Sequence, residues 1–164
     1  MFDVQTPLNI LHRRSISIND VTTMTARPGL WLSLRSDGKI ENVTNGVNPP
    51  VPKVTIDNLS SNQYESADVR GGRVLAVLEG TAIVKVDTAG VALVDGSSAP
   101  IVYAQGNYLK VAFDASGKTP DCIAADLGKL TKAVATDLAV AKIEFIPSTG
   151  IFVIQKFDVP VVVA

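Results

Sequence analysis

The chain has 164 residues, of which 46% are hydrophobic and 19% charged, so it is long enough for one domain with a hydrophobic core. Valine, isoleucine and threonine account for 46 residues against 4 glutamates and 4 glutamines, a balance that favours strands over helices. The formal net charge of −1 gives no electrostatic reason to expect nucleic acid or an anionic membrane as a partner.

The residues most used in metal and disulfide chemistry are scarce. Cys122 is the only cysteine and His12 is the only histidine, so neither an intramolecular disulfide nor a Cys/His zinc site is expected. The sequence also lacks phosphate-binding glycine loops and calcium loops, and we expect no cofactor. Because His12 lies outside the predicted core and most aspartates occupy turn signals, the sequence predicts a protein that is not an enzyme.

No targeting or membrane segment is predicted. The first ten residues lack the basic start and continuous apolar stretch of a secretory signal, and the longest apolar runs are much shorter than a transmembrane helix. We therefore expect a protein that is made in a cytoplasm and does not enter a membrane.

The chain divides into two predicted parts. Residues 1–25 are expected to form an N-terminal arm or edge strand, because Ile16 and Ile18 alternate with polar side chains. Residues 26–164 are expected to form a single β-rich domain, because apolar runs of strand length alternate with turn signals.

The domain is expected to begin with a hairpin and a long loop. Residues 30–34 and 40–43 have strand patterns, and the Asp37-Gly38 pair between them favours a tight turn. Residues 44–66 predict a long loop with one short strand at 53–56. Prolines make a central sheet strand through residues 48–52 improbable.

The next strands have the clearest patterns. Residues 73–78 and 81–86 flank Glu79-Gly80, and they predict a second hairpin. Turn signals then recur about every 8 to 12 residues, the spacing typical of sandwiches and barrels. Further strands are expected at 91–94, 101–104 and 108–113.

The last third of the chain is partly ambiguous. Residues 121–138 have apolar side chains at helical spacing, but Gly128 interrupts them, so a short helix is left open. A terminal hairpin is expected from 140–146 and 151–157, with an edge strand at 159–163. The predicted fold class is all-β: a small β-barrel or sandwich of short antiparallel strands with an N-terminal arm.

A set of residues near the N-terminus predicts a protein interface. His12, Arg13 and Arg14 form the only basic cluster, and arginines are enriched at protein interfaces. The alternative is that they are solvated charges that discourage unwanted sheet pairing. The candidate interface residues are His12, Arg13, Arg14, Ile16, Ile18, Arg27 and Trp31.

Several segments resemble one family of virion proteins. Residues 27–39, with a Pro-Gly step that leads a strand into an Asp-Gly turn, resemble the opening of tailed-bacteriophage capsid decoration proteins, also called head-stabilising or cement proteins. Residues 72–80 are similar to the paired strands of these proteins. Residues 128–131, 140–145 and 150–157 are similar to their closing hairpin.

The resemblance implies a non-enzymatic virion protein on the capsid exterior. Copies would bind the outer surface of an assembled capsid and stabilise it by bridging subunits of the major capsid protein, as a trimer or dimer. Residues 1–25 would make the capsid contact and order on binding, so that deletion of residues 1–20 would leave the melting temperature nearly unchanged. Two alternatives stay open: a head–tail or tail-tube component, and a small β-barrel binding module for sugar or peptide.

Overall fold

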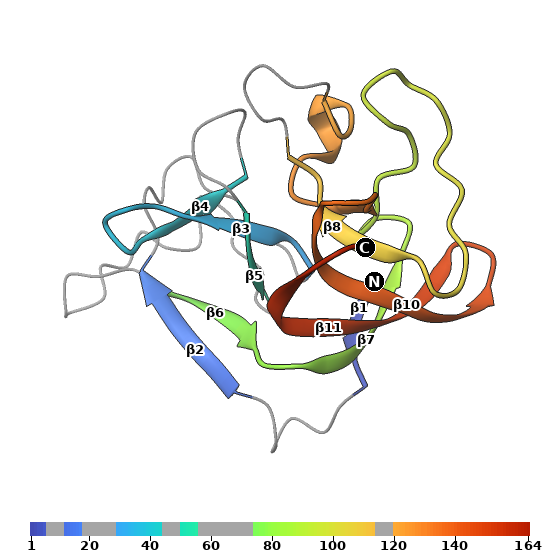
Figure 1. Cartoon of the computed structure of the whole chain (residues 1–164). Coiled ribbons are helices and arrows are strands. Elements are labelled where there is room, and N and C mark those ends of the chain that lie inside the picture. Colours follow the sequence, from blue (N-terminus) through green and yellow to red (C-terminus); the bar gives the residue numbers. More distant parts are fainter. Residues whose placement is uncertain (6–11, 18–28, 44–49, 56–73, 114–119) are drawn as a thin grey trace.

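Two antiparallel β-sheets make up the fold (Figure 1), which a computed structural model describes for residues 1–5, 12–17, 29–43, 50–55, 74–113 and 120–164. One sheet has the order β1-β7-β11-β10-β8-β9, with strands Phe2–Val4, Ala82–Asp87, Ile151–Val162, Leu138–Ser148, Tyr108–Val111 and Leu130–Lys132. The other has the order β2-β6-β5-β3-β4, with strands His12–Ser17, Val74–Glu79, Pro50–Thr55, Trp31–Leu34 and Ile40–Asn42. The all-β prediction is confirmed, and the sheets form a sandwich-like arrangement rather than a closed barrel.

Helical structure is limited in the described residues to one 3₁₀ turn, η2, at Ala124–Asp126. The helix left open in 121–138 is therefore three residues long, and β9 lies in the same stretch. Gly128 explains the early stop, because its φ of +80° turns the chain and a Cβ there would lie 3.2 Å from the Leu30 side chain. No helix described here is long and apolar enough to cross a membrane.

Both outer hairpins were predicted correctly. β3 and β4 pair through Leu34 and Ile40, and the side chain of Asp37 accepts the Lys39 N–H at 3.1 Å in the turn between them. β10 and β11 form the terminal hairpin, which Ser148 and Ile151 close. The expected separate strand at 159–163 is instead the continuation of β11.

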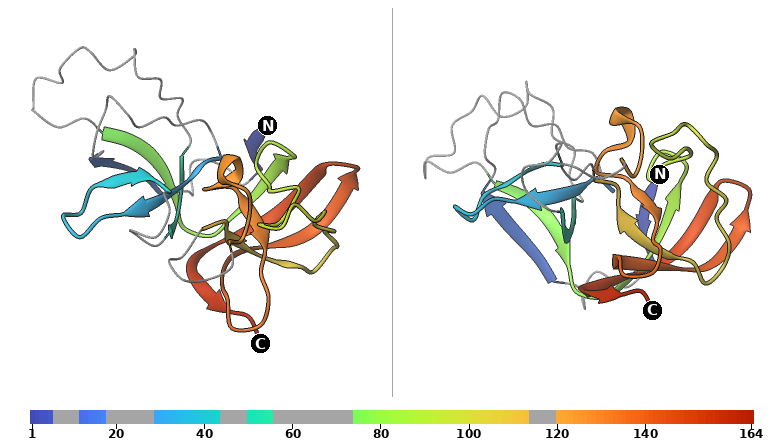
Figure 2. Two further views of the ribbon diagram at one scale, coloured as in Figure 1. Left: turned by 90° about the horizontal axis from the view of Figure 1, so that it is seen from above. Right: turned by 45° about the horizontal axis from the view of Figure 1, so that its top comes forward.

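The predicted hairpin of 73–78 with 81–86 is wrong. β6 pairs with β2 and β5, whereas β7 pairs with β1 and β11, so the chain leaves one sheet and enters the other at Gly80. Figure 2 shows the two sheets side by side, with the chain passing between them from β6 to β7. Gly80 has a φ of +84°, which suits a change of sheet as well as a hairpin turn.

For residues 50–52 the expectation of no central strand is also wrong, because β5 lies between β3 and β6 as a central strand; residues 48 and 49 lie outside the described residues. Its prolines are tolerated for a local reason. Trp31 is opposite Val54 and Leu32 is opposite Val51, so Pro52 lies in a bulge where the ladder has no partner for it. Pairing with β6 is confined to Val54 and Thr55, beyond the prolines.

The strands expected at 91–94 and 101–104 do not form. Residues 91–94 make only isolated bridges, Val91 with Leu130 and Val94 with Pro100, and residues 101–104 belong to no strand or bridge. The carboxylate of Asp95 accepts the N–H groups of Ser97 at 2.8 Å and of Ala99 at 2.9 Å, so a tight loop replaces a ladder.

One hydrophobic core joins the two sheets. Trp31, Val54 and Leu78 from the five-stranded sheet belong to the same buried cluster as Val84 and Ile154 from the six-stranded sheet. The half-buried side chains of Phe2 and Val4 pack against this cluster. The first residues of the chain therefore contribute to the core.

Tyr103 gives this core a pH-dependent contact. Its hydroxyl donates to the Ala92 carbonyl at 2.6 Å, and its ring meets that of Phe152 edge-on at 5.4 Å. Burial raises the pKa of Tyr103 from 10.0 to about 12, although a hydrogen bond with Thr131 acts in the opposite sense. Because the folded-state pKa is the higher one, the stabilisation is complete below pH 10 and is lost as the pH rises to about 12.

We therefore expect the stability advantage of the wild type over Tyr103→Phe to fall by about 2 kcal/mol between pH 9 and pH 12. Urea unfolding of both proteins at the two pH values measures it. The comparison between the two proteins removes the effect of the other groups that titrate in this range. An advantage that stays constant would contradict the buried position of the hydroxyl.

Candidate protein-binding surfaces

Four of the seven predicted interface residues, His12, Arg13, Arg14 and Ile16, lie in β2. This strand pairs with β6 and is the outermost strand of its sheet. On its other side no strand of the described residues lies against it, so its backbone can accept a further strand. Ile18 and Arg27 lie outside the described residues.

Trp31 is a core residue rather than an interface residue. Its side chain is 1% exposed, and its backbone N–H donates to the carbonyl of Gly128 at 3.1 Å. In the structure Leu32 and Ser33 are buried as well, so both faces of β3 are covered and the indole is inaccessible to a partner.

The expectation that residues 1–25 order only on binding does not hold for the two described parts of this segment. β1 already pairs with β7, and Phe2 and Val4 pack on the core. β2 already pairs with β6 over six residues. These parts can present a sheet edge to a partner, but they are not a free arm.

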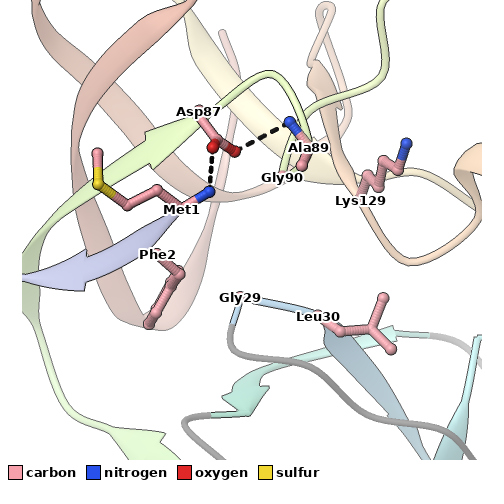
Figure 3. Close-up of a pocket in the computed structure, with 8 residues that line it drawn as sticks. All are labelled: Met1, Phe2, Gly29, Leu30, Asp87, Ala89, Gly90 and Lys129. Carbon is pink, nitrogen blue, oxygen red and sulfur yellow. Dashed lines mark hydrogen bonds and ion pairs between the residues drawn. The ribbon is translucent and has the colours of Figure 1, made fainter. Parts of the chain in front are cut away.

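A cavity of about 440 Å³ opens where β1, the start of β3 and the turn after β7 meet (Figure 3). Phe2 and Leu30 supply apolar walls from two segments that are far apart in the sequence. Gly29, with a φ of +90°, lets the chain approach closely, since a Cβ there would lie 2.8 Å from the Phe2 ring. The lining residues are Met1, Phe2, Gly29, Leu30, Asp87, Ala89, Gly90 and Lys129.

The charged groups around the cavity are already paired. Asp87 forms an ion pair with the amino group of Met1 and accepts the Ala89 N–H at 3.0 Å, as Figure 3 shows. The hydrogen bond with that amino group is the main reason that the pKa of Asp87 is lowered. Lys129 pairs with Asp126 at 2.5 Å. The cavity is therefore suited to an apolar group rather than to an anion or to acid–base chemistry.

Two further lysines of the described residues hold the fold together. Lys110 of β8 bridges Asp121 at 2.8 Å and Asp137 at 2.9 Å, which fixes two loops to the sheet. Burial lowers the pKa of Lys110, but the two carboxylates more than offset this effect and the pKa lies above its ordinary value. Lys156 of β11 is fully buried and donates to backbone carbonyls.

The described surface also presents apolar side chains. Twelve large hydrophobic residues among the described residues are exposed. Loops and the β10–β11 turn carry some of them, and the other end of the same hairpin carries others. They are Met1, Leu34, Leu93, Val102, Ile123, Val134, Leu138, Phe145, Ile146, Val159, Val161 and Val162.

Sequence reasoning missed both the cavity and this exposed surface. The cavity is built from four separated segments, and no local pattern links them. Residues 159–163 were expected as an edge strand, but a continuous apolar run does not show which of its side chains are exposed. Among the described residues, no three His, Cys, Asp or Glu side chains are grouped as metal ligands.

No protein-family model matches the chain, and neither a curated protein nor a solved structure has significant similarity to it. The function is therefore argued from the residues and the geometry above.

Proposed function

We propose that the chain is a non-enzymatic structural protein of a bacteriophage virion. It binds the outer surface of an assembled capsid as a small homo-oligomer and stabilises the shell by bridging subunits of the major capsid protein. The sequence resemblance in residues 27–39, 72–80, 128–131, 140–145 and 150–157 suggests the kind of partner. The structure supports the proposal through a different feature, the exposed apolar side chains of the described surface.

One observation carries the proposal. The ion pairs Lys110–Asp121, Lys110–Asp137 and Lys129–Asp126 serve the fold, while twelve large hydrophobic side chains face outward. A surface of this kind suits association with other proteins, because burial of exposed apolar area is the main driving force for it. Among the described strands, β2 and β4 are outermost in their sheet, so their margins can offer backbone groups to the same partners.

Binding to the assembled shell would stabilise that shell by mass action. A ligand that binds the closed capsid and not its separate subunits shifts the equilibrium toward the capsid. No catalytic group is needed for this activity, and neither a metal nor a cofactor enters it.

Co-sedimentation with undecorated, expanded capsids of the source virus tests the proposal. We expect the chain to pellet with these capsids, with saturation at a fixed ratio to the capsid protein, and to stay in the supernatant alone. A chain that polymerises alone into rings or tubes would favour a head–tail or tail-tube component. A chain that ignores capsids and remains small would favour a binding module, and both results would overturn the proposal.

A further inference from the structure

The cavity beside the first strand lies where residues of both sheets meet (Figure 3). Phe2 belongs to β1 of the six-stranded sheet, and Leu30 directly precedes β3 of the five-stranded sheet. The turn after β7 and Lys129, which precedes β9, complete the lining. The volume of about 440 Å³ lies within the range of roughly 300 to 1,000 Å³ that is usual for small-molecule pockets.

The turn after β7 contributes only small residues to the lining. Ala89 and Gly90 together present a single methyl group to this space. The φ of Gly90 lies outside the left-handed region, and a Cβ there would lie 3.5 Å from the Asp87 carbonyl oxygen, which is an ordinary contact distance. Gly29 differs, because its φ of +90° favours glycine. Backbone geometry therefore does not require the small residue at position 90, and the open space is not a consequence of the shape of the turn.

Each cation in the lining has an acidic partner. The amino group of Met1 pairs with Asp87, and Lys129 pairs with Asp126 at 2.5 Å. An anion that entered the cavity would lose hydration without gaining an unpaired cation, which is unfavourable. An uncharged apolar group would instead displace water from the apolar walls, which is favourable.

We propose that this cavity is a binding site for a small, uncharged and largely apolar molecule. Such a molecule would contact β1 on one side and the residues before β3 on the other, so it would join the first strand of one sheet to the other sheet. Because it binds the folded chain, it would raise the melting temperature in a saturable way. The inference does not rest on capsid binding, since the lining residues all belong to one chain.

Two fluorescent probes with the same ring framework test the class of ligand. N-phenyl-1-naphthylamine is uncharged, whereas 1-anilinonaphthalene-8-sulfonate carries an additional sulfonate and is an anion. We expect the uncharged probe to saturate at one site per chain and to bind about tenfold more tightly than the sulfonate. Equal affinities, tighter binding of the sulfonate, or no saturable binding of the uncharged probe would overturn the inference.

The variant Ala89→Trp tests whether the probe occupies this cavity. Ala89 is exposed on the turn, and the bond of its backbone N–H to the Asp87 carboxylate does not depend on the side chain. The indole would fill the space, and we expect the affinity for the uncharged probe to fall about tenfold. Ala99→Trp is the matched control, because Ala99 is also exposed, its N–H bonds to the Asp95 carboxylate at 2.9 Å, and it lies outside the lining. This control should bind the probe as the wild type does.

Melting curves give a second readout on the same proteins. At ten times its Kd, the uncharged probe should raise the melting temperature of the wild type and of Ala99→Trp by about 3 °C, and leave that of Ala89→Trp unchanged. Leu30→Asn, which places an amide in the apolar wall, should weaken the probe independently and serves if Ala89→Trp does not fold. A probe affinity that both cavity variants leave unchanged would place the probe on another apolar surface and overturn the inference.

Discussion

Replacement of Lys156 by alanine is expected to lower the free energy of unfolding by about 4 kcal/mol. Lys156 is fully buried between two alanines of the neighbouring strands, Ala82 and Ala141, whose small side chains leave room for its stem. Its Nζ donates to the carbonyls of Gly80 at 2.8 Å and Phe157 at 3.1 Å. The alanine variant would lose the packing of the stem and leave these carbonyls without this donor.

The same site holds the point where the chain changes sheets. The carboxylate of Asp158 accepts the Gly80 N–H at 2.9 Å, so Lys156 and Asp158 together bind both backbone groups of Gly80. This arrangement fixes the passage from β6 to β7 against β11.

Three variants separate the contributions at Lys156. Lys156→Met keeps most of the stem and should lose about 2 kcal/mol, chiefly from the missing hydrogen bonds. Lys132→Met, at an exposed position of β9, should stay within about 0.5 kcal/mol of the wild type. Urea unfolding measures all of them. If Lys156→Ala were as stable as Lys132→Met, Lys156 could not have the buried role described here.

Deletion of residues 1–20 is expected to lower the melting temperature by roughly 10 °C or more. This reverses the expectation drawn from the sequence that this deletion leaves the melting temperature nearly unchanged. β1 and β2 each pair with a strand of the body, and Phe2 and Val4 pack on the core. Loss of the two strands removes the half-buried side chains of Phe2 and Val4, which contribute about 3 kcal/mol to stability. It also exposes the edges of β6 and β7.

Differential scanning calorimetry of the deleted and full chains measures this effect. Phe2→Ala is the milder companion, and it should lower the melting temperature by a smaller amount because both edge strands remain. A deleted chain that melted within about 2 °C of the full chain would show that these strands do not support the fold.

The fold class and both hairpins with local turn signals could be predicted from the sequence. Asp37-Gly38 and the turn at 147–150 join strands that are neighbours in the sequence, and short-range patterns describe such pairs well. Glu79-Gly80 has the same local appearance, yet β6 and β7 belong to different sheets. Partners brought from residues 2–4 and 151–156 decide that difference, and no local pattern contains them.

The candidate binding surfaces were harder to predict for a related reason. Trp31 was assigned to an interface, whereas its place in the core shared by the two sheets buries it. Residues 159–163 were expected as an edge strand, but the sequence did not say which of their side chains are exposed; Val159 and Val161 lie beyond Lys156, where the pairing of β7 with β11 ends. Exposure depends on where neighbouring strands end, which is a property of the tertiary structure.

The most direct test of the proposed function is the thermal stability of the capsid itself. Undecorated, expanded capsids of the source virus would be heated with and without the chain, and genome release or shell disassembly would be followed by dye fluorescence. The proposal predicts that the chain raises the transition temperature in a saturable way, because it binds the closed shell. A transition temperature that is unchanged at saturating concentrations of the chain would contradict a stabilising role on the capsid.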